Sequence, residues 1–207
     1  MLEPLVTIKE ILRLLQRLNF KCRVYVMYIG MCVYSLLYGK KMLLYNFQTY
    51  AKWIGAGRVL VFLGARVGEK TNIDPCIIIQ NAEKGHCDQL EIGDHTYIGP
   101  GCLFDLAGKI QIGCDVALAA RTNIITHADV GDRPLQAIYP RKVGDVVVGD
   151  GAWIGVGAVI LQGVTIGEMS VVGAMSLVKH DIPPYTVSYG VPCRVVREIE
   201  GCMGGRK

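Results

Sequence analysis

The sequence predicts an all-β fold, a parallel β-helix made of six-residue repeats, with a helical appendage at its N-terminus. Bulky apolar residues recur every six positions in long runs between Val67 and Val178, and glycine or another small residue follows them at fixed offsets. Neither the 3.6-residue period of a helix nor the alternation of an ordinary strand produces this period. Residues 1–55 lack the repeat and carry apolar residues at helical spacing instead.

Each hexad is expected to form one short strand and one corner, so that three hexads complete one turn of a triangular prism. The head residues of the hexads would point inward: Val67, Ile73, Ile92, Ile98, Phe104, Ile112, Leu118, Ile124, Val148, Ile154, Ile160, Ile166, Val172 and Val178. Glycine often comes next because a corner needs backbone angles that a Cβ hinders. The fifth position is mostly small or β-branched, as at Thr96, Cys102 and Ala152, which suits a narrow interior. We therefore expect the β-helix over residues 56–192 and a C-terminal tail over residues 193–207.

Residues 1–55 are expected to be helical. Between residues 4 and 18 apolar side chains recur at helical spacing, with Lys9, Arg13 and Arg17 on the remaining surface. The apolar run from Val24 to Tyr38 is shorter than the roughly 20 residues that a bilayer span needs. Two interpretations stay open. The helices form a cap over the exposed end of the first coil, or residues 1–45 make a peripheral contact with a membrane, with their tyrosines at headgroup depth.

Composition excludes several other classes of protein. The chain has 207 residues, of which 25 are Gly, it is 51% hydrophobic, and its net charge is +4. The Lys and Arg residues form no long stripe, so we expect no nucleic-acid partner. The eight cysteines form no C-x-x-C pair and several occupy small-residue positions of the repeat, which predicts buried thiols and no metal site. Because no cleavable signal peptide is recognisable, we expect a reduced, cytoplasmic setting, with the protein either free or peripheral at the inner face of the membrane.

Two interruptions break the repeat, at residues 81–90 and 128–147, and functional residues often lie in such loops. The second interruption begins immediately after His127. Two extra residues follow Gly108, so the stacking register places Asp105 beneath Ile125, one coil below His127. A carboxylate and an imidazole on adjacent coils predict a general-base site, in which Asp105 binds substrate or orients the ring.

The sequence resembles the hexapeptide-repeat acyltransferases, which have a left-handed β-helix. Within them it is most similar to the branch of the galactoside and maltose O-acetyltransferases and the acetyltransferases of polysaccharide clusters. Three blocks between residues 148 and 200 carry the resemblance, in this order: V-G-D-G-A-W-I-G-V-G-A-V-I-L-Q-G-V-T-I-G, D-I-P-P and G-V-P-C-R-V-V-R-E-I.

The resemblance implies acetyl transfer from acetyl-CoA to a hydroxyl, in a homotrimer whose active sites lie between neighbouring prisms. We expect a sugar hydroxyl of a saccharide or a polysaccharide precursor as the acceptor. His127 holds the place of the family's general base, and Asp105 the place of an Asn or Asp that contacts the acceptor; Asn123 is taken as a second acceptor contact. The chemistry is consistent with these roles, because a hydroxyl needs a base near neutral pH and neutral imidazole supplies one.

The resemblance also implies a coenzyme groove between prisms. The residues expected to contact acetyl-CoA are Trp153, Val156, Ala158, Ala174, Lys179, His180, Arg194 and Arg197. The two arginines and Lys179 would pair with phosphates, and the alanines would let the pantetheine arm approach the backbone. The chain departs from its relatives at two places: Val156 stands where galactoside enzymes have Ser, and Lys179-His180-Asp181 stands where relatives usually read Thr-Lys-Asp.

Other functions remain as alternatives. A serine or amino-sugar acetyltransferase would use the same scaffold and coenzyme. A non-enzymatic alternative is a hexapeptide-repeat scaffold or ligand-binding trimer, against which His127, Asp105 and the C-terminal coenzyme block argue. The γ-type carbonic anhydrases bind zinc through three histidines, but His86, His95, His127 and His180 lack the paired spacing of such a site.

Overall fold

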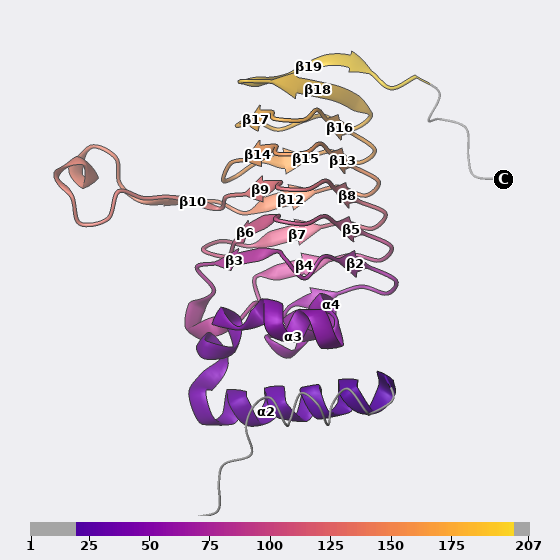
Figure 1. The fold of residues 1–207 in the computed structure, drawn as a ribbon. Helices are drawn as coiled ribbons and strands as arrows, with labels where there is room; N and C mark the ends of the chain where they lie inside the picture. The colour runs from indigo at the N-terminus through magenta and orange to yellow at the C-terminus, as the bar shows by residue number, and fades with distance from the viewer. Residues whose placement is uncertain (1–19, 201–207) are drawn as a thin grey trace, which may run out of the picture.

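The structure is a computed structural model that describes residues 20–200; the helix expected between residues 4 and 18 lies outside this range. Short coils stack into a column, with helices at one end and an antiparallel hairpin at the other (Figure 1). Three parallel sheets form the faces of this triangular prism, and the chain visits them in turn as it winds.

The strands of each face are given in sheet order. Face A contains β1 (Arg66–Val67), β4 (Leu90–Ile92), β7 (Ile110–Ile112), β12 (Val146–Val148) and β15 (Thr165–Ile166). Face B contains β2 (Asn72–Ile73), β5 (Tyr97–Ile98), β8 (Ala117–Leu118), β13 (Trp153–Ile154), β16 (Val171–Val172), β18 (Thr186–Gly190) and β19 (Cys193–Glu198). Face C contains β3 (Ile78–Gln80), β6 (Leu103–Asp105), β9 (Asn123–Ile124), β14 (Val159–Ile160) and β17 (Leu177–Val178).

The predicted inward stacking of the head residues is confirmed. Every head residue from Ile73 to Val178 is buried, and Val67 is half-buried at the first coil. In the C-terminal coils Val148 pairs with Ile166, and Ile160 pairs with Val178. The hexad pattern therefore produces one continuous apolar core along the prism axis.

Three helices cover the N-terminal end of the prism: α2 (Phe20–Tyr45), α3 (Phe47–Ile54) and α4 (Ala56–Phe62). The α4 helix packs on β1 and β2 and buries Ala56, Val59 and Leu60. This helix lies just beyond the boundary expected at residue 55 and also packs against α3. The α4 helix packs on β1 and β2 because the first coil has no coil beneath it, and an apolar helix covers its open end.

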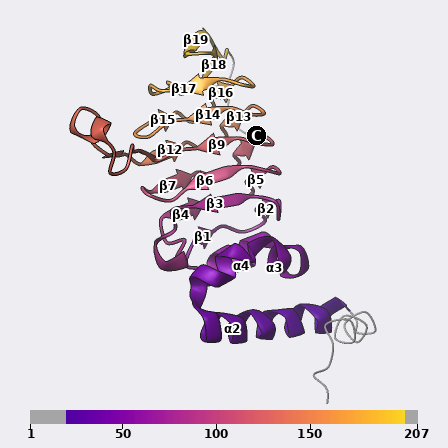
Figure 2. The ribbon, with the colours of Figure 1, turned by 60° about the vertical axis from the view of Figure 1, so that its left-hand side comes forward.

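The α2 helix forms a second layer outside α3 and α4, as two views agree (Figures 1 and 2). It bends at Gly39 and its C-terminal part touches the 3-10 helix η1 (Glu83–Gly85) of the first interruption. A Cβ on Gly85 would collide with the backbone of Lys40 and Lys41, so this close approach requires glycine. Within residues 20–200, no helix has the length and apolar character needed to cross a bilayer.

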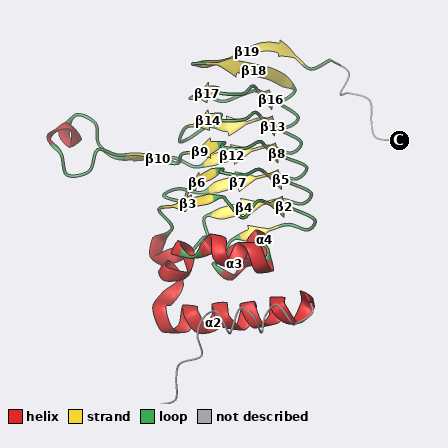
Figure 3. Ribbon diagram, in the orientation of Figure 1, coloured by secondary structure: helices red, strands yellow, loops and turns green. Residues whose placement is uncertain are grey.

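The C-terminal end differs from the expected tail over residues 193–207. Residues Cys193–Glu198 form β19, which pairs antiparallel with β18, while β18 pairs parallel with β16 (Figure 3). Without β19, the last strand of face B would leave its backbone hydrogen-bonding groups unpaired. The hairpin covers that edge.

The cysteines follow the prediction in part. Cys87, Cys102 and Cys193 are buried thiols, but Cys76 is exposed and Cys114 is half-buried. Cys102 fills a fifth position of the repeat and donates its thiol to the carbonyl oxygen of Ala119 at 3.2 Å. Burial, with a smaller contribution from Asp88, raises the pKa of Cys87 to about 12, so this thiol is not a nucleophile at neutral pH.

Candidate active site

His127 and Asp105 lie on adjacent coils at the edge where the chain passes from face C to face A. The register pairs Leu103 with Asn123 and Phe104 with Ile124, as the stacking arithmetic predicts. His127 begins β10 (His127–Ala128), which follows Ile124 after Ile125 and Thr126. Its Nδ1 lies 2.5 Å from Oδ2 of Asp105. The structure therefore brings together the two residues that the sequence placed on neighbouring coils.

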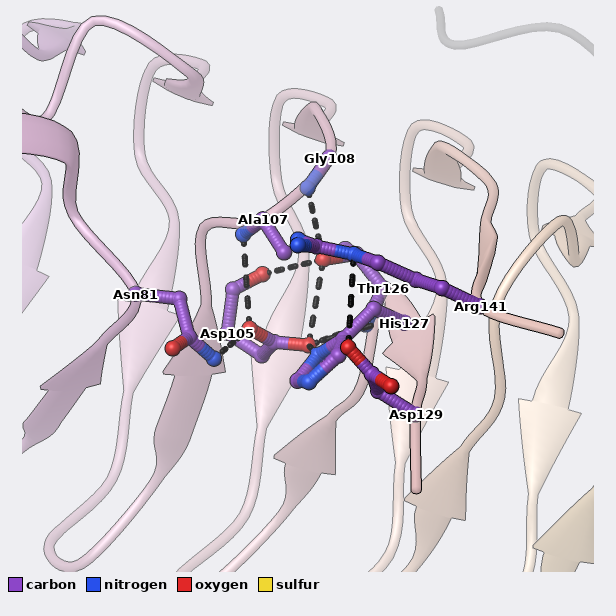
Figure 4. A network of polar contacts seen from close by, with 8 residues as sticks. All are labelled: Asn81, Asp105, Ala107, Gly108, Thr126, His127, Asp129 and Arg141. Atoms are coloured by element: carbon purple, nitrogen blue, oxygen red, sulfur yellow. Dashed lines mark hydrogen bonds and ion pairs between the residues drawn. The ribbon is translucent and has the colours of Figure 1, made fainter. Parts of the chain in front are cut away.

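The Asp105 carboxylate is the centre of a network of donors (Figure 4). Its Oδ1 accepts hydrogen bonds from the Asn81 side-chain amide at 2.6 Å and from the backbone N–H of Ala107 at 3.3 Å. Its Oδ2 accepts from the backbone N–H groups of Thr126 at 2.9 Å and His127 at 3.1 Å. The side chain is only 1% exposed, so these donors replace the water that a carboxylate otherwise needs.

This network keeps Asp105 ionised. Burial of the carboxyl by itself raises its pKa, but the hydrogen bonds from Asn81, His127, Thr126 and Ala107 favour the charged form and outweigh burial. The net result is a pKa of Asp105 below its ordinary value. The carboxylate is therefore a permanent negative charge beside the imidazole at neutral pH.

The position of this charge selects the tautomer of His127. An ionised carboxylate only accepts hydrogen bonds, so the Nδ1 of a neutral ring donates its proton to Asp105. The Nε2 atom then carries the free lone pair. Since 27% of the His127 side chain is exposed, the ring is accessible from outside the prism. This arrangement can take a proton from a group that approaches Nε2.

The second interruption forms a two-stranded arm that begins at His127. Strand β10 pairs antiparallel with β11 (Lys142–Val143), and the 3-10 helix η2 (Pro134–Ala137) lies at the far end of the arm. Figure 1 shows the arm projecting sideways from the column. Nε of Arg141 lies 3.8 Å from a carboxylate oxygen of Asp129 (Figure 4).

A cavity of about 590 Å³ lies next to the network, on the side of the first interruption. Asn81 and Ala107 connect it to the Asp105 carboxylate. The remaining side chains that line it are mostly polar or charged: Ala82, Glu83, Lys84, His86, Asp88, Gln89, Leu106 and Arg141. Such a lining suits a ligand rich in hydroxyl groups.

The two expected acceptor contacts differ in accessibility. Asp105 is buried and both of its oxygens already accept hydrogen bonds. This geometry supports a role in orienting the His127 ring and does not support a direct contact with an acceptor. Asn123 lies on face C, half-buried, and its amide donates to the carbonyl oxygen of Arg121 at 3.0 Å. Its amide oxygen is the part that an acceptor would meet.

The expected coenzyme contacts lie on different sides of the prism. Trp153, Arg194 and Arg197 are exposed on face B, which is opposite the edge that carries His127. The register places Trp153, Val171, Val187 and Arg197 in one row across that face. Val156 and Ala174 lie at the corner between faces B and C, and both are exposed.

Lys179 and His180 are exposed on the same edge as His127, two coils further along the prism. Ala158 is fully buried, because the fifth position of a hexad faces the interior, so its side chain is not accessible at the surface of the protomer. A single protomer therefore does not bring the remaining candidates together around His127.

Two site residues escaped the sequence analysis. Asn81 stands at the start of the first interruption, where the repeat gives no register, although Gln80 stacks beneath Asp105. Thr126 is fully buried; its hydroxyl donates to the Asp105 carbonyl oxygen at 2.6 Å and accepts from the Gly108 N–H at 2.8 Å. Its position directly between Ile125 and His127 was the available signal. In the described range, no three His, Cys, Asp or Glu side chains are grouped as a metal site would need.

Comparison with known proteins identifies the family of this chain. The model of the bacterial transferase hexapeptide (six repeats) family matches residues 145–180. The structure of a maltose O-acetyltransferase from Clostridium difficile 630 is similar with a TM-score of 0.62 and 32% identity, over 77% of this chain and 89% of that one. The chain belongs to the hexapeptide-repeat acyltransferase family.

Other members of the hexapeptide-repeat family extend the comparison. The structure of a hexapeptide-repeat acetyltransferase from Vibrio cholerae O1 biovar eltor, complexed with acetyl coenzyme A, matches with a TM-score of 0.68 and 29% identity, over 78% of this chain and 86% of that one. The galactoside O-acetyltransferase of Escherichia coli (strain K12) is 36% identical over an alignment of 128 residues, and the match covers 52% of this chain and 63% of that enzyme. The chain thus spans less than two thirds of the length of this curated relative.

Proposed function

We propose that the protein transfers an acetyl group from acetyl-CoA to a sugar hydroxyl, with His127 as the general base. The observation that carries this proposal is the contact of 2.5 Å between Nδ1 of His127 and the buried Asp105 carboxylate, which leaves Nε2 free to accept a proton. The names of the relatives support the choice of reaction, since they include a galactoside and a maltose O-acetyltransferase.

In this mechanism the acceptor hydroxyl gives its proton to Nε2 of His127 as its oxygen attacks the thioester carbonyl. Asp105 stabilises the imidazolium and holds the ring through Nδ1. The tetrahedral intermediate then breaks its C–S bond, and the leaving sulfur takes the proton from Nε2. The products are an acetyl ester and the free thiol of CoA. Val156 offers no side-chain donor to the oxyanion, so we assign a backbone N–H at that corner to this role.

We further propose a homotrimer of left-handed β-helices, with the active site between subunits. The support is the division of the candidate residues between His127's edge and face B on the opposite side. If face B of one protomer faces the His127 edge of the next, then Trp153, Arg194 and Arg197 reach the same groove as Lys179 and His180. The arginines and Lys179 would there bind the phosphates of acetyl-CoA. A cytoplasmic setting, where acetyl-CoA is available, completes the proposal.

The acceptor is proposed to be a saccharide or a polysaccharide precursor. The cavity beside Asn81 supports this class because its lining offers several hydrogen-bonding side chains and few apolar ones. Serine and amino sugars are included as acceptors in the assay because a serine or amino-sugar acetyltransferase is the alternative enzyme.

The deciding experiment measures release of the CoA thiol from acetyl-CoA with sugars, nucleotide sugars, serine and amino sugars as acceptors. We expect release with a hydroxyl sugar, and a rate reduced about a hundredfold or more in His127→Ala. The matched control is His95→Asn, which changes an exposed histidine at a corner with positive φ, where Asn is well tolerated, and should leave the rate unchanged.

Activity that is unaffected by His127→Ala would disprove the general-base mechanism. Binding of CoA without turnover of any acceptor in this panel would favour the non-catalytic ligand-binding trimer. Light scattering gives the mass of the assembly, and a monomer that is fully active would contradict the site between subunits.

A further inference from the structure

The outward side of α2 is apolar. Tyr25, Ile29, Val33, Leu36 and Leu37 recur at helical spacing and are all exposed, with Leu36 87% and Tyr25 73% accessible. A surface helix of a globular protein normally carries polar side chains on this side. Contiguous exposed apolar patches of this kind mark interaction sites.

The opposite side of α2 is already used for packing. Met31 is fully buried, and Val24, Met27 and Tyr34 pack against the same core as α3 and α4. Between Val24 and Tyr38 the sequence contains no charged residue. The helix is therefore apolar on both sides, which is typical of helices that pack against a partner on both sides. Within residues 20–200, only one side of α2 has such a partner.

The sequence that contains this helix is strongly basic. Residues 1–68 contain ten of the 22 Lys and Arg residues but only two of the 18 Asp and Glu residues, so that they carry +8 and the remainder carries −4, which together give the chain's +4. No acidic residue occurs from Ile11 to Gly68. Lys41 is exposed directly beyond the kink, and Nζ of Lys40 lies 5.9 Å from the ring centroid of Phe62. The missing cover should therefore be anionic as well as apolar.

The position of α2 suits a flat surface. It crosses the base of the column, at the end opposite β19, with the arm well above it in both views (Figures 1 and 2). Tyr25, Tyr38 and Tyr45 are exposed along the helix, and tyrosine prefers the boundary between lipid headgroups and acyl chains. A second copy of the chain fits less well, since two such bases would bring like charges together.

We propose that α2 lies in the interface of an anionic lipid membrane, with Ile29, Val33 and Leu36 in the acyl boundary and lysines at the phosphates. The helical cap then lies between the membrane and the β-helix, which projects away from the membrane surface. This inference does not depend on the acetyltransferase activity, because it rests on α2 and the charge of residues 1–68 alone.

Vesicle flotation of the full chain tests the proposal. Wild-type protein should float with phosphatidylcholine vesicles that contain one quarter phosphatidylglycerol, and at least several-fold less with phosphatidylcholine alone or at high salt. The double variant Ile29→Gln/Leu36→Gln should bind the anionic vesicles at least about tenfold more weakly than the wild type. Both positions are exposed and Gln is a good helix former, so the unfolding temperature should not fall.

The matched control is Ile138→Gln, which removes an equally apolar side chain, 71% exposed, from the arm and should bind vesicles like the wild type. A second variant, Lys41→Gln, should lower binding to anionic vesicles only. Failure of the wild type to float with anionic vesicles would overturn the proposal, as would undiminished flotation of the double variant. Sedimentation velocity that shows a smaller assembly for the double variant, with no flotation of either protein, would identify a second copy as the cover and also overturn it.

Discussion

At the scale of single residues, the site depends on a carboxylate that has no contact with bulk water. Asp105 keeps its charge because Asn81, Thr126, His127 and Ala107 all donate to it. Hydrogen bonds to a buried charge are stronger than those between neutral groups, and each fixes the direction of a lone pair. The orientation of the His127 ring therefore depends on the donors that hold the Asp105 carboxylate in place.

Asn81 is expected to be a positioning residue. Asn81→Gly removes the amide that donates to Asp105 at 2.6 Å, and glycine accepts the positive φ of 55° at this position without strain. Loss of a hydrogen bond to a charged group predicts a fall of about tenfold or more in kcat/KM. Because this hydrogen bond lowers the pKa of Asp105, its loss should raise that pKa, so the acid-induced fall in the free energy of unfolding should begin at higher pH in the variant.

The exposed Asn72 of face B provides the control for this variant, and Asn72→Gly should leave the acid dependence of unfolding unchanged. A purely structural role of Asn81 would lower the free energy of unfolding equally at all pH values. An unchanged acid dependence, with the rate reduced, would therefore contradict the role of Asn81 in holding the Asp105 carboxylate.

Asp105 also predicts how stability depends on pH. Its pKa is lower in the folded protein than in the unfolded chain, so its contribution is fully present above the unfolded pKa of about 3.9 and is lost as the pH falls through the lower folded value. The free energy of unfolding of the wild type should exceed that of Asp105→Asn at pH 7, and the difference should shrink below about pH 4. Urea unfolding across this range measures it. A difference that stays constant down to acid pH would show that Asp105 is not ionised in the fold.

The sequence predicted the contact between Asp105 and His127 because both follow stacked head residues, whose register can be counted. It could not predict Asn81, since the number of residues in an interruption does not reveal which one turns back toward the site. It also could not decide between the two roles of Asp105, because that choice depends on donors from three separate segments: Asn81, Ala107 and Thr126.

At the scale of elements, the helical cap protects the first coil, and α4 provides the direct contact. Leu60 is fully buried, whereas its neighbour Val61 is 52% exposed. Leu60→Ala should lower the free energy of unfolding by about 2–4 kcal/mol through lost burial and a residual cavity. Val61→Ala should change it by less than about 0.5 kcal/mol. Equal effects of both substitutions in denaturant unfolding would show that α4 does not pack on the first coil as described.

The elements predicted well are those with an internal repeat. Each hexad predicts one strand, so the three faces can be predicted from the sequence between Val67 and Val178. The α4 helix was missed because Ala56–Phe62 is short and apolar, and it adjoins the first hexad without a recognisable boundary. The β19 strand was missed because it pairs antiparallel with β18. Both strands lie beyond the last hexad, so the repeat gives no signal for them.

At the scale of the whole molecule, the fold is a one-dimensional stack. A coil in the middle, such as the one containing β12, has hydrogen-bonded neighbours on both sides, while β19 is an edge and β10–β11 form a sheet of two strands. In stacks of this kind, stability is a sum of contacts between neighbours, so the ends open more easily than the middle.

Hydrogen exchange followed by mass spectrometry should therefore show a gradient along the prism. Amides of β8, β9, β13 and β14 should exchange on the order of a thousandfold more slowly than those of the β10–β11 arm, since the former open only with most of the stack. Leu60→Ala should speed exchange in β1 and β2 before it affects β13, because α4 packs on β1 and β2. Uniform exchange from β1 to β18 would indicate that the prism opens as one cooperative unit, and slow exchange in the arm would show that another chain covers it.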